Sequence, residues 1–446
     1  MDEDLLSAGV SAERAPVRIA YDIGILARLK ECGVPESGLA RAARCTLNSM
    51  LKDPRVEITI VTCEAPFSAM RVCRESGWSE HFKVAGPFWS PLVLHAVFYL
   101  ESFLARLSAQ RGRPRRILRS LLFRITHLLK QAPIQPLAAE LLRGCKVYHS
   151  SFLKIPQEAF AVPECIKFLY VHDVIAIRHP EWFEQRATED LREILNSLTA
   201  ECSVITNSEF TREDFVKATG FPAERVSVAP LAANRRLFFP CRSAADQSRV
   251  RQRIGLREEQ PFLLSLCTIE PRKNLAKALH AWELARSKYQ LNDLAIVLAG
   301  QLGWQQEGFS TFLDSFGEAR KYIHTPGYIA DKDLAPLYSA STAFLYLSQY
   351  EGFGLPPLEA MQCGVPVIAS NLTSIPEIVG DAAVLVNPDD PDGIASVIGS
   401  LLDSPGRAEE LGAMALDQSK LYSWGRCASD CITSYLRALN TTPGVS

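Results

Sequence analysis

The sequence predicts an α/β protein of two domains, each built from a parallel sheet wrapped by helices. Its 446 residues are too many for one ordinary hydrophobic core. Apolar, strand-like runs alternate with helical stretches, as in a parallel sheet covered by helices. The alternation occurs twice, separated by a polar stretch over residues 240–261. Two similar domains that face each other leave a cleft, the usual place for a ligand.

Composition narrows the class of protein. The 47% hydrophobic and 22% charged residues are typical of a globular protein, and the net charge of −2 argues against nucleic-acid binding. Twelve scattered cysteines include no Cys-x-x-Cys pair, so we expect reduced thiols, no metal site and a cytoplasmic location. The N-terminus has no apolar signal core, and the longest apolar run, residues 91–100, is about half of a membrane-spanning helix. No membrane crossing is expected.

The first half is predicted to hold a flexible tail over 1–15 and a domain over 16–239. Its expected strands are 17–23, 56–63, 146–150, 167–171, 203–208 and 226–229. Its expected helices are 39–51, 188–201 and 211–220, the first preceded by a loop. One strand ends at His172 and Asp173, and ligands in open α/β sheets bind at such carboxyl ends. His172 could orient a hydroxyl or phosphate of a ligand, and a purely structural role is the alternative.

An aromatic and basic insertion over 86–130 interrupts this alternation. After several aromatic residues, the stretch 106–130 carries eight Lys and Arg residues and no acid. A helix pair of this kind can lie on an anionic membrane face, and we expect such a peripheral contact through 102–130. There are two alternatives. The segment could bind a phosphorylated or lipid-linked substrate, or it could be a basic helix that is only solvated.

The second half is predicted to form a domain over 240–423. Its expected strands are 262–268, 294–300, 322–325, 342–348, 365–370 and 382–386. Its expected helices begin at 275, 331 and 392. A last helix over 424–446 is expected to cross back to the first domain.

The stretch from Tyr350 to Pro366 is the first candidate site. It follows a predicted strand, turns on Gly352 and Gly354, and enters a helix that begins with two prolines. Glycine allows close approach to the backbone, and a helix N-terminus suits a phosphate. With Glu351 and Glu359 beside this loop, the pattern predicts a seat for a phosphorylated sugar. A buried strand–turn–helix corner is the alternative.

Arg272 and Lys273 form the second candidate site. They follow a predicted strand and precede a helix for which Asn274 is the expected N-cap. Two cations at a strand end beside a helix start suit a diphosphate. Because both candidate sites lie at strand ends in the same half, we predict one shared site.

With these motifs, residues 262–390 resemble the second half of the retaining glycosyltransferases of family 4, the glycosyl transferases group 1 set. The resemblance rests on Thr268-Ile-Glu-Pro-Arg-Lys-Asn274, the Glu-x7-Glu pattern from Glu351 to Glu359, and Gly364-Val-Pro366. The first half matches more weakly, through Gly38, His172-Asp173 and Asn207-Ser208. The resemblance implies a GT-B fold, in which two Rossmann-like βαβ domains face each other across a cleft.

The resemblance also assigns roles. Arg272 and Lys273 would hold the diphosphate, and Glu359 the ribose. The sugar would be positioned by Glu351 with the backbone of Gly352, Phe353, Gly354 and Leu355. The base would lie near Tyr328 and Ile329, with Thr268 also on the donor side. His172, Asp173 and the Gly38 loop would face the sugar, phosphate and acceptor.

The expected function is transfer of a sugar from a nucleotide sugar, with retained anomeric configuration, to a glycan or lipid-linked acceptor. The Glu-Pro-Arg-Lys-Asn form favours GDP-mannose and synthesis of a surface polysaccharide. The alternatives are a UDP-sugar glucosyltransferase, a sugar-nucleotide epimerase and a non-catalytic scaffold on a membrane surface. We expect neither cofactor nor metal, since no Asp-x-Asp pair follows a predicted strand. The expected location is the cytoplasm, peripheral on the inner face of the plasma membrane.

Overall fold

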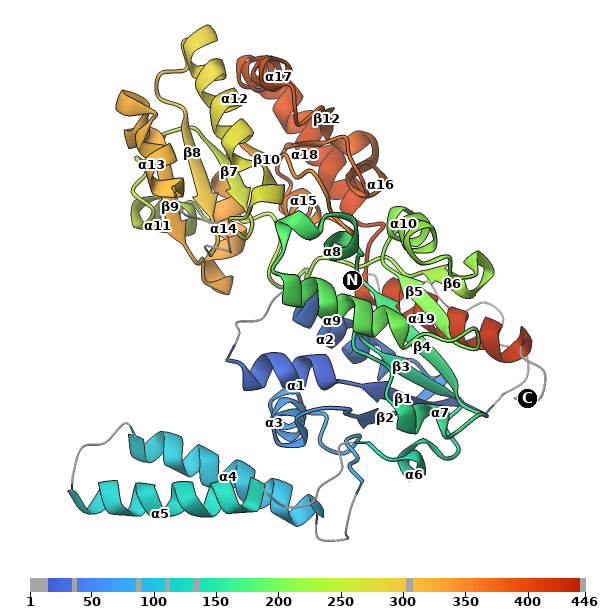
Figure 1. Ribbon diagram of the computed structural model, residues 1–446. Coiled ribbons are helices and arrows are strands. Elements are labelled where there is room, and N and C mark those ends of the chain that lie inside the picture. The colour runs from blue at the N-terminus through green and yellow to red at the C-terminus, as the bar shows by residue number, and fades with distance from the viewer. Residues whose placement is uncertain are drawn as a thin grey trace. The chain divides into compact units, whose positions relative to one another are not determined.

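Two six-stranded sheets form the framework of the protein (Figure 1). The computed structural model describes residues 15–33, 38–85, 90–108, 113–130, 137–301 and 308–441. The strand orders are β2-β1-β3-β4-β5-β6 and β12-β11-β10-β7-β8-β9. The predicted two-sheet α/β architecture is confirmed. Residues 1–14 of the predicted tail lie outside the described residues.

The first sheet has buried central strands. Its strands are β1 (Val17–Asp22), β2 (Val56–Val61), β3 (Val147–Ser150), β4 (Ile166–Val171), β5 (Ser203–Thr206) and β6 (Val226–Val228). Every residue of β3 and β4 is buried, as expected for parallel strands covered on both faces. The helices along this part of the chain include α2 (Gly38–Met50), α3 (Pro66–Ser76), α8 (Ile175–Arg178), α9 (Gln185–Asn196) and α10 (Glu209–Thr219).

One element of this half corrects the sequence analysis. Where a loop was expected after β1, helix α1 (Gly24–Glu31) begins at once. The Asp22 carboxylate accepts the N–H of Gly24 at 2.7 Å, which satisfies one of the free donors of the new helix. A Cβ on Gly24 would lie 2.8 Å from the Leu153 side chain and 3.0 Å from Cys63 Sγ, so a larger residue would fit at this helix start only if those side chains moved.

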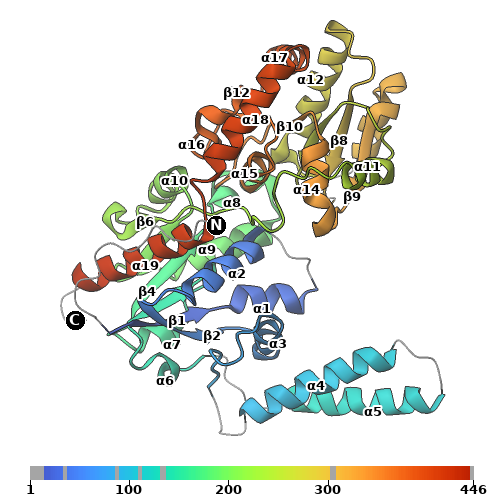
Figure 2. The same ribbon diagram turned by 180° about the vertical axis from the view of Figure 1, so that it is seen from behind.

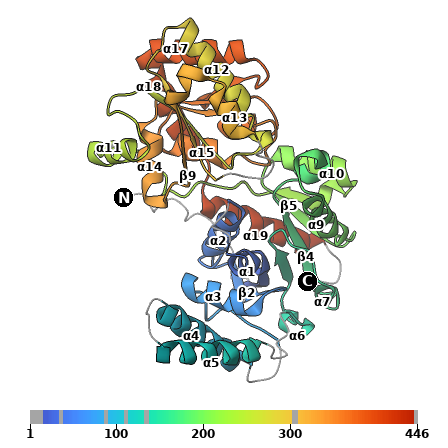
Figure 3. The same ribbon diagram turned by 60° about the vertical axis from the view of Figure 1, so that its left-hand side comes forward.

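The second sheet is covered on both faces. Its strands are β7 (Phe262–Leu266), β8 (Ala295–Ala299), β9 (Ile323–Gly327), β10 (Ala343–Tyr346), β11 (Val367–Ser370) and β12 (Val384–Val386). Its helices are α11 (Ala244–Arg253), α12 (Leu275–Lys288), α13 (Phe309–Asp314), α14 (Asp331–Ala340), α15 (Leu355–Gln362), α16 (Ile375–Val379), α17 (Pro391–Asp403) and α18 (Pro405–Ser419). Figure 3 shows α12 and α13 on one side and α11 and α14 on the other. For α12, α13 and α14, which connect parallel strands, right-handed crossovers require this distribution, because the chain reverses direction along the sheet after β9.

The chain divides into two compact units. One holds the residues up to Tyr170, Ile194–Ile205 and those from Ala428 onwards. The other holds Val171–Glu193 and Thr206–Cys427. Helix α19 (Trp424–Thr441) thus belongs mostly to the first unit, where Tyr435 Oη lies 2.8 Å from His149 Nδ1. The predicted domain limits at 15/16, 239/240 and 423/424 stay a prediction.

The aromatic and basic insertion forms a helix pair. Helices α4 (Ser90–Ser108) and α5 (Arg113–Lys130) lie side by side in Figures 1 and 2. Lys130 of α5 pairs with Glu101 of α4 at 2.6 Å. Arg74 of α3 binds His95 and Tyr99 of α4, each at 3.0 Å. No helix within the described ranges is long and apolar enough to cross a membrane.

Candidate active site

The two glycines of the predicted loop are both structurally required. Gly354, just before α15, has φ +106°, a left-handed conformation that favours glycine. A Cβ on Gly352 would lie 2.2 Å from the carbonyl oxygen of His172 and 2.8 Å from the Cβ of Asp173. The close approach at Gly352 is therefore made by the protein's own chain, from the segment that follows β4.

One carboxylate oxygen of Glu351 accepts three hydrogen bonds and forms an ion pair with Arg272. Its Oε1 lies 2.9 Å from Arg272 Nη1, 2.5 Å from Lys273 Nζ, 2.8 Å from Tyr346 Oη and 2.6 Å from Ser348 Oγ. Burial alone would raise the pKa of Glu351, but the charges of Arg272 and Lys273 outweigh that effect and lower it to about 2. Glu351 is therefore a carboxylate at neutral pH.

Arg272 is held by a second carboxylate that the sequence analysis did not assign to the site. Its Nε forms an ion pair with Glu270 Oε1 at 2.6 Å, and its Nη1 donates to the carbonyl of Tyr350 at 3.0 Å. Burial opposes the charge of Arg272, yet Glu351 and Glu270 outweigh it and raise its pKa above the ordinary value. Glu270 lies inside the cation motif, two residues before Arg272. An acid so close to an arginine that is predicted to bind phosphate could have indicated that the two side chains pair.

Asn274 corrects the predicted helix cap. It occupies the N-cap position of α12, but its backbone is left-handed at φ +56° and its side chain does not cap the helix. The side-chain amide instead donates to the carbonyl of Pro388 at 3.1 Å. Asparagine tolerates this conformation better than most residues, and here it ties the cation motif to the loop before α17.

The other predicted donor-side residues lie on α15 and in the segments that follow β7 and β9. Glu359 of α15 is buried and accepts a hydrogen bond from Tyr338 Oη at 3.2 Å. Tyr328 and Ile329 follow β9, and Tyr328 is exposed. Thr268 is exposed after β7. Because carboxyl ends of parallel strands meet at one edge, Thr268, Tyr328 and Ile329 share that edge with the Glu351 loop.

His172 and Asp173 belong to the compact unit that contains this loop. Burial lowers the pKa of His172 to about 3, so its imidazole is neutral at pH 7. Burial raises the pKa of Asp173, whose Oδ1 accepts the N–H of Ile175 at 3.1 Å. Gly38 begins α2 in the other unit. A neutral imidazole can accept a hydrogen bond from a hydroxyl group beside the Glu351 loop.

Gly352→Ala is expected to destabilise the fold. The added methyl group would overlap a backbone carbonyl, and overpacking of this kind costs about 1–3 kcal/mol. Denaturant unfolding followed by circular dichroism measures the change. Gly406→Ala is the matched control, because Gly406 is exposed on α18 and an added Cβ would meet nothing within 4 Å. Alanine should be neutral or stabilising at this helical position. Equal stability of the two variants would contradict the close contact at Gly352.

Known proteins resemble this chain in sequence and in fold. The family model "Glycosyl transferases group 1" matches residues 246–417, which include Arg272, Lys273, Glu351 and Glu359. O-antigen chain mannosyltransferase B of Escherichia coli is 36% identical over 266 residues, 59% of this chain and 68% of that protein. Serotype-specific mannosyltransferase WbdA of Escherichia coli is 31% identical over 276 residues, which are 61% of this chain but 33% of WbdA.

Solved structures show the same fold at low sequence identity. HepE of Anabaena, determined in complex with UDP and glucose, has a TM-score of 0.60 at 17% identity and covers 96% of this chain and 100% of its own. A glycosyltransferase from Rickettsia africae has a TM-score of 0.64 at 12% identity, with 96% and 100% covered. WaaG, a glycosyltransferase of lipopolysaccharide biosynthesis, has a TM-score of 0.56 at 15% identity, again with 96% and 100% covered. The predicted GT-B fold is confirmed. The chain belongs to the glycosyl transferases group 1 family and is a GT-B glycosyltransferase that resembles the mannosyltransferases of polysaccharide synthesis.

Proposed function

We propose that the protein transfers mannose from GDP-mannose, with retention of anomeric configuration, to a glycan or lipid-linked acceptor in surface polysaccharide synthesis. The observation that carries the proposal is the buried cluster in which Arg272 and Lys273 converge on Glu351 at the carboxyl edge of the second sheet. The mannosyltransferase relatives and the Glu-Pro-Arg-Lys-Asn motif support mannose as the sugar. HepE was determined with UDP and glucose, which makes a UDP-sugar the second candidate.

The cluster suits departure of a nucleoside diphosphate. Such a leaving group needs stabilisation of developing negative charge, and fixed cations in a buried site provide it without reorganisation. Arg272 is held between Glu270 and Glu351, and Lys273 between Glu351 and Tyr346. In the proposed complex, both cations bind the diphosphate.

The remaining roles follow from position on the sheet edge. Glu359 would hold the ribose, and Tyr328 with Ile329 the base. Glu351 and the backbone of Gly352 to Leu355 would orient the sugar, with neutral His172 accepting a hydrogen bond from a sugar hydroxyl. Glu351 has a pKa of about 2, and one of its oxygens accepts three hydrogen bonds and pairs with Arg272, which makes the carboxylate a weak nucleophile. We therefore assign it to positioning and not to a covalent intermediate of the glycosidase type.

A thermal-shift screen with GDP-, UDP- and ADP-sugars tests the choice of sugar donor. A ligand that binds only the folded state adds about 2.7 kcal/mol of stability at a hundredfold excess over its Kd. We expect GDP-mannose to give the largest shift in melting temperature. NMR of the product should show the same anomeric configuration as in the donor. The transfer rate should be the same in the presence of EDTA. A shift with UDP-sugars alone would select the second candidate. No shift with any nucleotide sugar would overturn the proposal.

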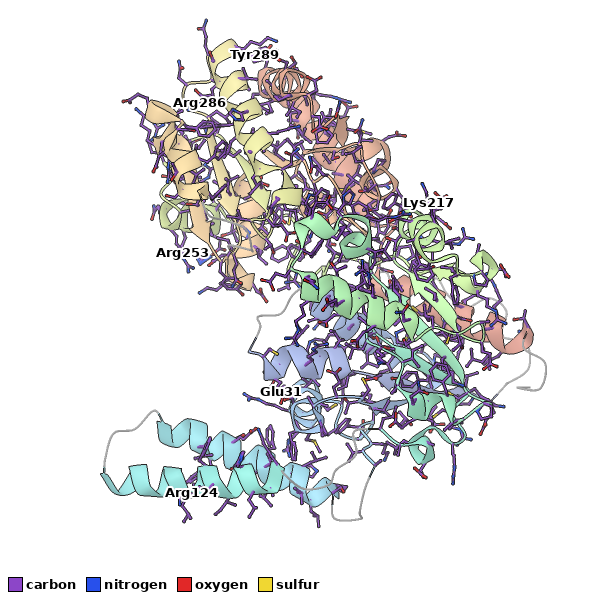
Figure 4. The ribbon with its side chains drawn as sticks, viewed as in Figure 1. Glu31, Arg124, Lys217, Arg253, Arg286 and Tyr289 are labelled. Carbon is purple, nitrogen blue, oxygen red and sulfur yellow. The ribbon has the colours of Figure 1, made fainter. Side chains whose placement is uncertain are left out.

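We also propose that the α4–α5 pair docks on an anionic membrane. Leu121, Ile125 and Leu128 of α5 are all exposed, and their spacing places them on one face of the helix. In α4, Leu92, Tyr99 and Phe103 are exposed at a similar spacing. Arg124 is also exposed on α5 (Figure 4). Exposed apolar side chains beside a stretch without acids fit the interface of anionic lipid.

Binding to vesicles is expected to need both charge and apolar contact. Each basic residue near such a surface contributes about 1 kcal/mol, so replacing four should abolish sedimentation with phosphatidylserine vesicles at physiological salt. The variant replaces Arg113, Arg115, Arg116 and Arg119 with Gln, and a second replaces Leu121 and Leu128 with Ser. The control replaces four exposed cations of the other unit with Gln, namely Lys217, Lys321, Arg407 and Lys420. Unchanged sedimentation of the first two variants would contradict membrane docking.

A further inference from the structure

The first turn of α10 binds the carbonyl group of Gly352, the residue after Glu351. Ser208 Oγ and Thr211 Oγ1 donate to the carbonyl oxygen of Gly352 at 2.6 and 2.8 Å. Both hydroxyl-bearing side chains are fully or almost fully buried. Two donors occupy both lone pairs of this oxygen, which fixes the orientation of the peptide.

The same helix also holds the residue that precedes Glu351. The hydroxyl of Tyr350 donates to the carboxylate of Asp214, one turn further along α10. The Tyr350 ring lies edge-on to Phe210 and His179, with centroids 5.4 and 5.5 Å apart. Arg178 pairs with Asp214 at 2.6 Å and completes the attachment. Both neighbours of Glu351 in the sequence are therefore bound to one helix.

Helix α10 is itself anchored at its N-terminus. The carboxylate of Glu377, on α16, accepts the N–H groups of Glu209 and Phe210 at 3.0 and 3.2 Å. A carboxylate at this end of a helix satisfies free N–H groups and complements the helix dipole. Since all these residues belong to one compact unit, α10 and the Glu351 loop are held as one body.

We propose that Ser208 and Thr211 are positioning residues for the sugar donor. By fixing the Gly352 peptide, their hydroxyls set the direction of the Glu351 carboxylate and of the backbone amides up to Leu355. The inference rests on the proposed function, because it concerns how a nucleotide sugar is held at that loop. Loss of one hydroxyl leaves the buried Gly352 carbonyl with a single hydrogen-bond partner, so the orientation of this peptide is less tightly fixed.

Thr211→Val is the discriminating variant. Valine keeps the shape of threonine, and the N-cap of α10 survives because Ser208 Oγ still accepts the backbone N–H of Thr211 at 3.0 Å. We expect kcat/KM for the nucleotide sugar to fall about tenfold, the effect of one hydrogen bond at the upper end of its usual range. KM for the acceptor should not change, and Thr211→Ser should restore the rate.

Thr219→Val is the matched control. It is the same substitution on the same helix, but Thr219 Oγ1 bonds at the other end of α10, where it donates to the carbonyl of Phe215 at 2.8 Å and accepts the N–H of Phe221 at 3.2 Å. Hydrogen–deuterium exchange over residues 350–355 gives a readout that needs no substrate. We expect faster exchange in Thr211→Val than in the wild type or in Thr219→Val.

The outcomes separate the two proposals. Wild-type protein that binds no nucleotide sugar would overturn the proposed function, and exchange at the loop would still decide whether α10 fixes it. Wild-type kinetics in Thr211→Val would overturn the inference and leave the proposed function intact. A third outcome is that Thr211→Val lowers the melting temperature and reduces kcat/KM equally for donor and acceptor, and that Thr211→Ser does not restore the rate. This outcome would assign Thr211 a structural role only and would also overturn the inference.

Discussion

Lys273→Met is expected to lower kcat by about 10²- to 10³-fold, the usual effect of removing one preorganised charge from a site where negative charge develops. The ammonium group lies 2.5 Å from Glu351 Oε1 and 2.8 Å from Tyr346 Oη, and the side chain is buried. Methionine fills a similar volume without charge. One of the two cations proposed for the diphosphate is then lost, and Glu351 keeps Arg272 as its only cationic partner within the described residues.

Stability has to be measured beside activity, because breaking a buried ion pair costs about 3–5 kcal/mol. Activity is therefore expressed per folded protein, from steady-state rates and a denaturant titration of the same preparation. Lys277→Met is the matched control, four residues along the chain, where an exposed lysine pairs with Asp389 at the surface. An exposed pair of this kind contributes little. A Lys273→Met enzyme with the rate of the control would remove the diphosphate role from Lys273.

Glu359→Gln is expected to weaken binding of the nucleoside diphosphate about 10- to 100-fold. Hydrogen bonds to charged groups contribute about 1.5–3 kcal/mol, and each 1.4 kcal/mol is a factor of ten in Kd. Glutamine keeps the size of Glu359 and still accepts from Tyr338, so the packing of α15 should be retained. Isothermal titration calorimetry with GDP measures the loss.

The control for Glu359→Gln is Glu318→Gln, which makes the same change in a side chain that is 99% exposed. Its Kd for GDP should equal that of the wild type. Tight binding of GDP by Glu359→Gln would show that this carboxylate does not hold the ribose. Binding by both variants at wild-type strength, with loss only in Lys273→Met, would place the nucleoside elsewhere on the sheet edge.

The free protein keeps its site cations neutralised. Arg272 and Lys273 face two buried carboxylates, Glu270 and Glu351, so the charges of the cluster balance before any ligand binds. Buried cations without such partners would be costly. The partners also fix the side-chain directions, which reduces the entropy lost when a diphosphate is bound.

The sequence predicted the features that depend on local pattern. Buried apolar runs marked the strands of both sheets, and glycine and proline marked the turn into α15. Helix α1 was missed because it depends on the Asp22 side chain and close packing at Gly24. The direction of the Asn274 amide was missed because its partner, the carbonyl of Pro388, lies in a distant loop.

The sequence could not show which distant residues hold the Glu351 loop. Ser208 and Gly352 are 144 positions apart, and nothing near either residue indicates that they touch. Serine before a helix is a common N-cap, and the cap bond to the Thr211 N–H is indeed present. Its second role appears only when packing brings the carbonyl of Gly352 against the same hydroxyl group.

The most direct test of the donor site is a crystal structure of the protein with bound GDP-mannose. We predict that the diphosphate lies against Arg272 and Lys273, the ribose against Glu359, and the sugar beside Glu351 and the backbone of residues 352–355. A diphosphate bound away from both cations, with their ion pairs to Glu270 and Glu351 unchanged, would contradict the proposed site.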